Sequence, residues 1–380
     1  MEHAEQKHIV VGLSGGVDSS VAAWLLQKLG HRLTGLFMKN WEEDDDNGYC
    51  AAEEDYKVAD AVCKRLDIPL RGVSFAAEYW DQVFSRFLED SAAGLTPNPD
   101  VLCNREIKFK AFLDFALSLG ADLIATGHYA RTTKDEEGYR LWKAVDANKD
   151  QSYFLYALGQ RELAKTLFPL AGLAKTEVRA LARRAGLPNY DKKDSTGLCF
   201  IGERPFKAFL ARFLPPEPGE IRTVDGVTKG CHDGLMYYTL GQRHGLGIGG
   251  PGGPWYVAAK DTRRNVLYVV EGDTHPSLFT QRLEAGDISW VAGVPPKLPF
   301  HCRAKIRYRQ VEQPCVIDAI PRGLGVSFQR AQWAATPGQA VVFYSDDLCL
   351  GGGVITQVTP LRAIEDRDVE LIGTTVSGHS

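Results

Sequence analysis

Apolar and polar positions alternate along the first half of the chain in a way that predicts strands and helices in turn. Short apolar runs predict buried strands, and apolar residues at a spacing of three or four predict helices. Strands are expected at 9–11, 33–38 and 122–126, and helices at 18–29, 53–66 and 176–185. Up to about residue 212 this alternation indicates an α/β fold with a doubly wound, mostly parallel, Rossmann-like sheet. Ligands bind such sheets at the carboxyl ends of the strands.

The second half of the chain has a different pattern. The run Pro215–Gly219, PPEPG, marks a boundary. A glycine-rich stretch follows, and from about residue 277 short apolar strands separated by turns predict a small antiparallel β-barrel. We therefore expect three domains: a catalytic domain at 1–212, a small central domain at 213–276, and a barrel at 277–380 with a frayed tail. Gly245, Gly247 and Gly250 formally match a dinucleotide fingerprint, but Pro251 follows where a helix would have to begin, so we interpret them as loop.

Charge and cysteine content narrow the choice of function. The 380-residue chain has a formal net charge of −4, which excludes a uniformly basic nucleic-acid binder but not a local basic patch. No apolar run of about 18 residues is present, so no membrane span is expected. The polar start MEHAEQKH does not resemble a signal peptide. None of the eight cysteines forms a C-x-x-C pair. A cytoplasmic protein without a structural zinc site is expected.

The stretch LSGGVDSSV, residues 13–21, lies between the first predicted strand and the first predicted helix. Glycines allow the backbone to approach a ligand closely, and the amides at a helix start attract anions. The stretch lacks the lysine of a Walker A loop, so a P-loop NTPase is not indicated. Asp18 would repel phosphate unless a cation lay between them, which predicts a pyrophosphate bound with Mg²⁺.

Two cysteines stand in unusual surroundings. Cys103, in TPNPDVLCNREIKFKAF, is expected at or just before the start of a helix that begins near Asn104. Its position near Arg105 and Lys108 would stabilise a thiolate. Cys199, in KKDSTGLCFIG, lies in a glycine-bracketed loop. A reactive Cys103 is favoured over a buried structural thiol, whereas for Cys199 the surroundings favour neither.

The stretch CRAKIRYRQ carries four cations at alternate positions. If it is one strand, Arg303, Lys305, Arg307 and Arg309 share one face. Without a carboxylate among them, this face is predicted to contact phosphates rather than only solvent.

These stretches together resemble known families. The loop at 12–19 resembles the signature of PP-loop ATP pyrophosphatases, which adenylate a carbonyl oxygen. Over residues 8–360 the chain is similar to the tRNA-specific 2-thiouridylases, bacterial enzymes that thiolate the wobble uridine of some tRNAs. The matching stretches include GLSGGVDSSV, GLFMKNWEEDD, TPNPDVLCN, ATGHY, NKDQSYFLY, KKDSTGLCFIGER, GLMYYTLGQRHGLGIGG, RYRQ and TPGQAVVFY.

The resemblance implies roles for individual residues. Asn98, Pro99 and Asp100 would face the target base, with Cys103 as nucleophile and Cys199 as carrier of a persulfide sulfur. The residues implied to bind ATP are Gly12, Leu13, Ser14, Gly15, Gly16, Val17, Asp18, Ser19, Met38 and Gly127. Those implied to contact tRNA are His128, Lys149, Asp150, Gln151, Arg307, Tyr308 and Gln339.

We interpret the sequence as that of an ATP-dependent tRNA sulfurtransferase. It would adenylate O2 of the wobble uridine, with Asp100 as a proton carrier. Sulfur would then come from a persulfide donor, either a cysteine desulfurase or a relay protein. A PP-loop amidotransferase or ligase is a second interpretation, although it has no use for two reactive thiols. A nucleotide-sensing RNA-binding protein is a third.

Overall fold

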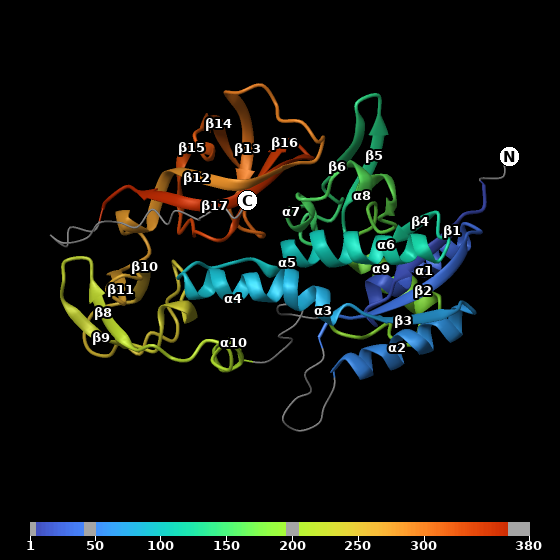
Figure 1. Cartoon of the computed structure of the whole chain (residues 1–380), viewed down its shortest axis with the longest axis horizontal. Helices are drawn as coiled ribbons and strands as arrows, with labels where there is room; N and C mark the ends of the chain where they lie inside the picture. Colours follow the sequence, from blue (N-terminus) through green and yellow to red (C-terminus); the bar gives the residue numbers. More distant parts are fainter. Residues whose placement is uncertain (1–4, 42–50, 195–204, 364–380) are drawn as a thin grey trace.

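The computed structural model describes residues 5–41, 51–194 and 205–363 of the chain. Cys199, Cys50 and the tail predicted to be frayed lie outside these described residues. The described chain forms three sheets: a parallel one, a small four-stranded one and a barrel (Figure 1). The sheets follow one another along the chain, apart from one hairpin.

The parallel sheet belongs to the first part of the chain. Its strands are β1 (His8–Gly12), β2 (Arg32–Lys39), β3 (Leu70–Ser74), β4 (Leu123–Ala125) and β7 (Thr166–Leu167), in the order β3-β2-β1-β4-β7. Helices α1 (Val17–Lys28), α2 (Ala51–Leu66) and α9 (Lys175–Arg184) pack on it through one apolar cluster. Ile9, Val10 and Val11 of β1 are fully buried because the strand lies in the middle of the sheet. The predicted strands and helices are confirmed.

A long helical stretch joins this sheet to the rest of the molecule. It consists of α5 (Pro99–Leu102), the π-helical η2 (Cys103–Ala111) and α6 (Phe112–Ser118), which follow one another without a break. A short turn separates it from α4 (Ser85–Ala92). The remaining helices of this part are α3 (Ala76–Tyr79), η1 (Trp80–Phe84), α7 (Ser152–Leu155), α8 (Gln160–Ala164) and α10 (Phe206–Leu210).

The middle of the chain forms the small sheet. Its strands are β8 (Gly219–Thr223), β9 (Thr228–His232), β10 (Trp255–Asp261) and β11 (Val266–Glu271), in the order β10-β11-β8-β9. A single 3₁₀ turn, η3 (Leu235–Tyr237), precedes the glycine-rich segment. Residues 245–253 form bends and irregular chain rather than a helix, so the rejection of the dinucleotide fingerprint is confirmed.

The C-terminal strands close into a six-stranded antiparallel barrel. They are β12 (Phe279–Trp290), β13 (Phe300–Lys305), β14 (Gln313–Ile320), β15 (Gly323–Trp333), β16 (Ala340–Ser345) and β17 (Leu348–Pro360), preceded by η4 (Pro276–Leu278). Their order is β12-β15-β14-β13-β16-β17, and pairing of β12 with β17 closes the ring. The predicted fold class is therefore confirmed.

One hairpin from the first part of the chain joins the barrel sheet. Strands β5 (Arg131–Asp135) and β6 (Gly138–Trp142) form it, and Leu141 and Trp142 pair with β17. A single apolar cluster also runs through all three parts, with members such as Tyr153, Leu267 and Val342. The parts therefore pack on a shared core, and the boundaries at 212 and 276 stay a prediction. Among the described residues, no helix is long and apolar enough to cross a membrane.

Candidate active site

The candidate site lies at the point of the parallel sheet where the strand order reverses, between β1 and β4. Strand β1 has β2 on one side and β4 on the other, so the loops after β1 and β4 meet at the carboxyl edge, where such sheets bind ligands. A Cβ on Gly127, after β4, would lie only 2.6 Å from the Ser19 nitrogen. A Cβ on Gly12 would lie 3.4 Å from Cε of Met38. The structure thus brings the residues expected to bind ATP to one corner, where glycines permit the close approach.

The loop at 13–16 is held from within and from outside. Ser20 Oγ donates to the Gly16 carbonyl at 2.9 Å, and the Ser14 amide donates to Ser19 Oγ at 3.3 Å. Gly15 has φ +72°, and a Cβ there would lie 2.6 Å from the Asp55 carbonyl, so only glycine fits. Asn189 Nδ2 donates to the Gly15 carbonyl at 2.9 Å. The loop is a preformed cradle at the start of α1.

Asp18 has a partner that the sequence did not reveal. Both of its carboxylate oxygens accept hydrogen bonds of 2.7 Å from Lys175 Nζ, and Tyr129 Oη donates to it at 2.8 Å. Burial and the nearby carboxylate raise the pKa of Tyr129, so the phenol keeps its proton. An ammonium group therefore already offsets the charge of Asp18, and the Mg²⁺ expected beside it stays a prediction. No local motif marks Lys175, which reaches the loop from the start of α9.

A second carboxylate gathers three cations beside this pair. Asp194 accepts from Lys149 at 2.5 Å, from Lys175 at 2.8 Å and from Arg179 at 2.8 Å. Burial favours the neutral acid, but the hydrogen bonds from Lys149 and Lys175 outweigh it and lower the pKa of Asp194 to about 2. Lys192 adds a further cation close to the loop, 2.5 Å from Asp55 Oδ1 and 3.4 Å from the Gly15 carbonyl. Lysines distant in sequence thus gather beside a loop that has no Walker lysine.

Cys103 is not at the start of a helix, which corrects the sequence-based expectation. Asn98 is the N-cap, its Oδ1 accepting from the Asp100 amide at 3.2 Å, and Pro99 takes the first helical position. Proline and an asparagine cap together start the helix earlier than the apolar pattern indicated. Cys103 follows within the continuous helix and is 0% exposed. Arg105 is paired with Glu106 and Asp287, so its charge is already partly offset.

The same helix connects Cys103 to the ATP loop. A Cβ on Gly12 would lie 3.2 Å from the Phe112 ring, which stands nine positions after Cys103. Asn104 Nδ2 donates to the Phe154 carbonyl at 3.1 Å, and the Phe154 ring packs 4.6 Å from that of Tyr308. The helix therefore lies between the loop and the hairpin carrying Tyr308.

The other residues implied to contact tRNA do not form one cluster, and several of them hold neighbouring backbone in place. Gln151 Oε1 accepts from the Tyr129 amide at 2.9 Å, and Gln339 Nε2 donates to the Thr96 carbonyl at 2.7 Å. Asp150 is 3% exposed and its carboxylate accepts from Ala144 and Ser152, so this side chain stabilises its own turn. Burial, with the nearby Lys108 charge, lowers the pKa of His128 to about 3. The tRNA roles of these residues stay predictions.

The basic stretch at 303–309 is not a single strand, so the prediction of four cations on one face is wrong. Strand β13 ends at Lys305, and the chain turns before β14. Lys305 is 8% exposed and bonded to Glu312 at 3.1 Å. Arg307 lies against Trp333 and donates to the carbonyls of Leu240 and Ala334. The alternation of cations predicted one strand wrongly, because the hairpin turn falls within the charged run.

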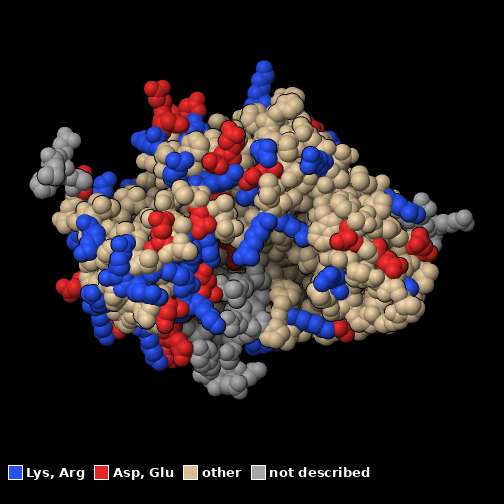
Figure 2. Space-filling model, turned by 180° about the vertical axis from the view of Figure 1, so that it is seen from behind, with Lys and Arg blue, Asp and Glu red and all other residues tan. Residues whose placement is uncertain are grey.

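The charge on the surface is uneven although the net charge is small. Figure 2 shows Lys and Arg side chains gathered over the α/β part, at the left of that view, and at the rim of a hollow in the middle of the molecule. Such a local arrangement suits a polyanion despite the formal net charge of −4.

Comparisons with known proteins cover nearly the whole chain. Family models match at residues 7–203, described as a tRNA methyl transferase HUP domain, at 207–271, a tRNA methyl transferase PRC-barrel domain, and at 280–355, an aminomethyltransferase beta-barrel domain. A relative from Methylococcus capsulatus is 61% identical over 92% of this chain and 96% of its own length. It is called tRNA-specific 2-thiouridylase MnmA. The chain belongs to the tRNA-specific 2-thiouridylase family.

Two further members carry the same name. The Nitrosococcus oceani protein is 59% identical over 93% of this chain and 98% of its own length. The Francisella tularensis subsp. novicida protein is 56% identical over 92% of this chain and 99% of its own length. The methyl transferase wording of the family models differs from the 2-thiouridylase name. We follow the relatives, because high identity over almost the full length of both chains is the more specific likeness.

Proposed function

We propose that this protein is an ATP-dependent tRNA sulfurtransferase that converts the wobble uridine to 2-thiouridine. One observation carries the proposal: a single unbroken helix starts at the Asn98 cap, contains Cys103 and packs its Phe112 ring against the glycine loop. A nucleotide in that loop and a thiol-bearing segment are thereby held in fixed relation. An amidotransferase or ligase gains nothing from this arrangement.

The proposed reaction has two stages. The uridine O2 attacks the α-phosphorus of ATP, the bond to the β-phosphate breaks, and pyrophosphate leaves. The terminal sulfur of a persulfide on Cys199 then attacks C2, and AMP departs with the former O2. A Cys103 thiolate finally attacks Sγ of Cys199, which leaves the sulfur on the base and a Cys103–Cys199 disulfide for a reductant. In a variant of this stage, Cys103 attacks the persulfide first and releases hydrogen sulfide, which attacks C2.

The residues of the loop corner have separate tasks in the first stage. Amides at the start of α1 would hold the phosphates, and Lys175 and Lys149 would exchange carboxylate for phosphate oxygens as ATP arrives. Asp18 would be the ligand of a Mg²⁺ bound with the nucleotide, since Mg²⁺ typically takes one or two carboxylates plus substrate phosphates. Such an ion would offset charge on the pyrophosphate. The described residues contain no group of three or more potential metal ligands, so the protein alone offers it little.

The experiment supplies ATP, a tRNA transcript with a wobble uridine, and a cysteine desulfurase with cysteine as the persulfide source. We expect release of pyrophosphate and a nucleoside with sulfur in place of oxygen, identified by mass spectrometry. A methylated nucleoside would instead support the wording of the family models. Sulfur-free turnover of ATP would support a nucleotide-sensing RNA binder.

A matched pair of cysteine variants tests the assignment of the nucleophile. Cys103→Ser should bind ATP and tRNA normally and form no 2-thiouridine. Cys63→Ser removes an equally buried thiol, 1% exposed, from the helix α2 side of the parallel sheet and should retain activity. Wild-type thiolation by Cys103→Ser would contradict the mechanism.

A further inference from the structure

The turn between α4 and α5 is held by both of the other parts of the molecule. Lys260 Nζ, from β10 of the small sheet, donates to the Gly94 carbonyl at 2.9 Å. From the barrel side, Gln339 Nε2 donates to the Thr96 carbonyl at 2.7 Å, and the Thr96 amide donates to the Pro337 carbonyl at 3.0 Å. Two residues beyond Thr96 the chain reaches the Asn98 cap. The entry to the Cys103 helix is therefore clamped between the small sheet and the barrel.

Close backbone packing shows how tightly this turn is seated. A Cβ on Gly338 would lie 2.8 Å from the Thr96 backbone, and one on Gly94 would lie 2.4 Å from Cγ2 of Thr262. Gly94 also has φ +81°, a conformation that side chains with a Cβ rarely adopt. Neither contact leaves room for the turn to shift toward its neighbours.

Lys260 is a costly residue for this place. Within the described part of the chain its ammonium has the Gly94 carbonyl as its only polar contact, and no carboxylate lines the cavity beside it. Burial lowers the pKa of Lys260 to about 7. Lys260 is partly exposed, and withdrawing much of an ammonium from water without a carboxylate partner is still unfavourable, a cost that an apolar side chain of similar length would avoid. Stability alone does not account for a lysine here.

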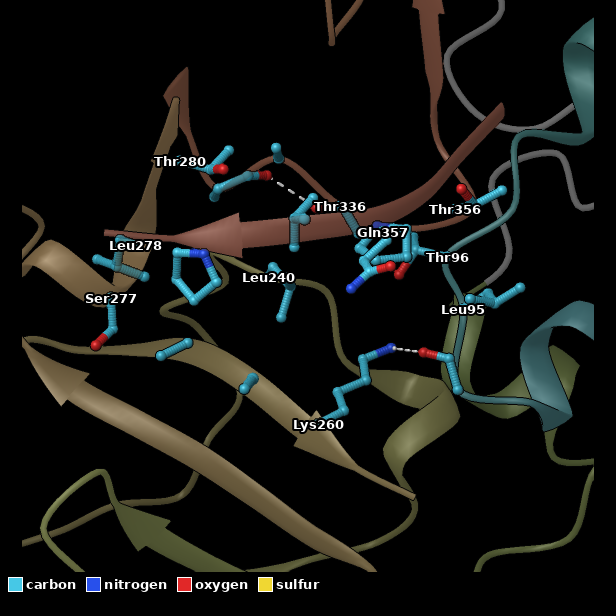
Figure 3. A pocket seen from close by; sticks show the side chains of 18 of the residues that line it. Leu95, Thr96, Leu240, Lys260, Ser277, Leu278, Thr280, Thr336, Thr356 and Gln357 are labelled. Atoms are coloured by element: carbon cyan, nitrogen blue, oxygen red, sulfur yellow. Dashed lines mark hydrogen bonds between the residues drawn. The ribbon is translucent and has the colours of Figure 1, made fainter. Parts of the chain in front are cut away.

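The space around Lys260 is open rather than filled. A cavity of about 150 Å³ lies at the junction, lined by the 93–96 turn, by β10 and by barrel segments including Thr336 and Gln357 (Figure 3). Figure 3 shows the Lys260 side chain extending across it to the turn, which carries Leu95 and Thr96. The Thr96 hydroxyl is buried there and has no hydrogen-bond partner among the described residues. Packing does not fix the turn on the cavity side, so on that side the lysine hydrogen bond holds it, while the barrel holds it on the other.

We propose that Lys260 is a positioning residue for tRNA thiolation, whose ammonium holds the Gly94 turn and thereby sets the place of Asn98 and Cys103 against the target uridine. The inference rests on the proposed function. Lys260 lies outside the ATP loop and the thiol-bearing segments, so it acts through the turn and not on the substrate. A displacement of about 1 Å at a reacting group can lower a rate by about a hundredfold.

The test compares Lys260→Met with wild type in steady-state thiolation. We expect kcat to fall by about ten- to a hundredfold. KM for tRNA and for ATP should stay within about twofold, because Lys260 is itself neither in the ATP loop nor among the residues implied to contact tRNA. The midpoint of thermal unfolding should be unchanged or higher, since the variant removes a partly buried ammonium that has no carboxylate partner. A purely structural role would instead lower the melting temperature along with the rate.

Chemical rescue provides the second readout. Lys260→Ala enlarges the existing cavity, and ethylammonium or propylammonium added to the assay should restore at least part of kcat without changing KM. Lys229→Met is the matched control, because Lys229 lies in the same small sheet and its ammonium rests on the Trp255 ring, 4.5 Å from the centroid. The added amines should leave kcat of both the control and wild type unchanged.

The outcomes separate this inference from the proposed function. Unchanged kcat in Lys260→Met, or parallel loss of kcat, melting temperature and tRNA affinity, would overturn the positioning role. Lack of rescue in a folded Lys260→Ala that has lost kcat would overturn it too. If wild type forms no 2-thiouridine under the same conditions, the proposed function fails, whatever the variants do.

Discussion

Two partly buried lysines have opposite kinds of partner. At the ATP loop, Lys175 is held by two carboxylates, Asp18 and Asp194, with a side chain only 12% exposed. At the junction of the three parts, Lys260 has a carbonyl as its partner. A carboxylate can be exchanged for a phosphate oxygen of similar charge and geometry, so the first site is suited to ligand exchange. A lone carbonyl offers no such exchange, which suits the second to holding a backbone in place.

The largest expected effect separates the two lysines by nucleotide binding. Lys175→Met should weaken ATP binding by about ten- to a hundredfold, because it removes a charge-assisted hydrogen bond and leaves Asp18 to repel phosphate. Lys260→Met should leave ATP binding unchanged. Calorimetric titration of both variants measures this, with Lys28→Met at the exposed end of α1 as the control for loss of a lysine. Equal loss of ATP affinity in both variants would show that the two lysines do not differ in ligand exchange.

A smaller effect concerns how the charge network at the loop depends on pH. The pKa of Asp194 is lowered to about 2, below the roughly 3.9 of an unfolded aspartate. Its stabilising contribution is therefore complete above about pH 4 and is lost as the pH falls through about 2. After allowance for solvent screening, the side chain being 31% exposed, we expect about 1 kcal/mol.

Thermal unfolding of wild type and Asp194→Asn as a function of pH tests this contribution. Above about pH 4 the wild type should be the more stable, because the variant leaves Lys149, Lys175 and Arg179 without their shared carboxylate. The difference should shrink as the acid is protonated. A stability difference between wild type and variant that grows toward low pH would contradict a stabilising role of the ionised Asp194.

The smallest effect concerns the salt dependence of tRNA binding. Arg309 is exposed in the turn after β13, whereas Arg307 is engaged with Trp333 and two backbone carbonyls. Arg309→Ala should therefore reduce the slope of log affinity against log salt by about one unit or slightly less. Arg307→Ala should change the slope little and lower thermal stability instead. Binding measured at several salt concentrations distinguishes the two, and a reversed pattern would return Arg307 to the phosphate contacts.

Local sequence was sufficient for much of the fold and for one half of the site. Strands β1, β2 and β4 and helices α1, α2 and α9 follow from apolar periodicity and from glycines at their ends, since these signals act over a few residues. The glycine and serine spacing at 12–19 predicted, for the same reason, the glycine loop that the structure shows at the start of α1. The basic run at 303–309 misled, because a period-two pattern carries no information about where a hairpin turns. The helix start at Asn98 was missed because a cap and a proline outweighed the apolar pattern.

The sequence by itself determined the order of elements, the doubly wound sheet, the barrel and the family likeness, because each depends on short-range pattern or on strings of matching residues. The tertiary structure alone decided which residues distant in sequence lie in contact. Lys175 reaches Asp18 across 157 positions, and Lys260 reaches Gly94 across 166. Such pairings depend on how sheets and helices pack, and nothing within a few residues of either lysine encodes its partner. The clamp on the Cys103 helix became visible only when the small sheet and the barrel were folded against it.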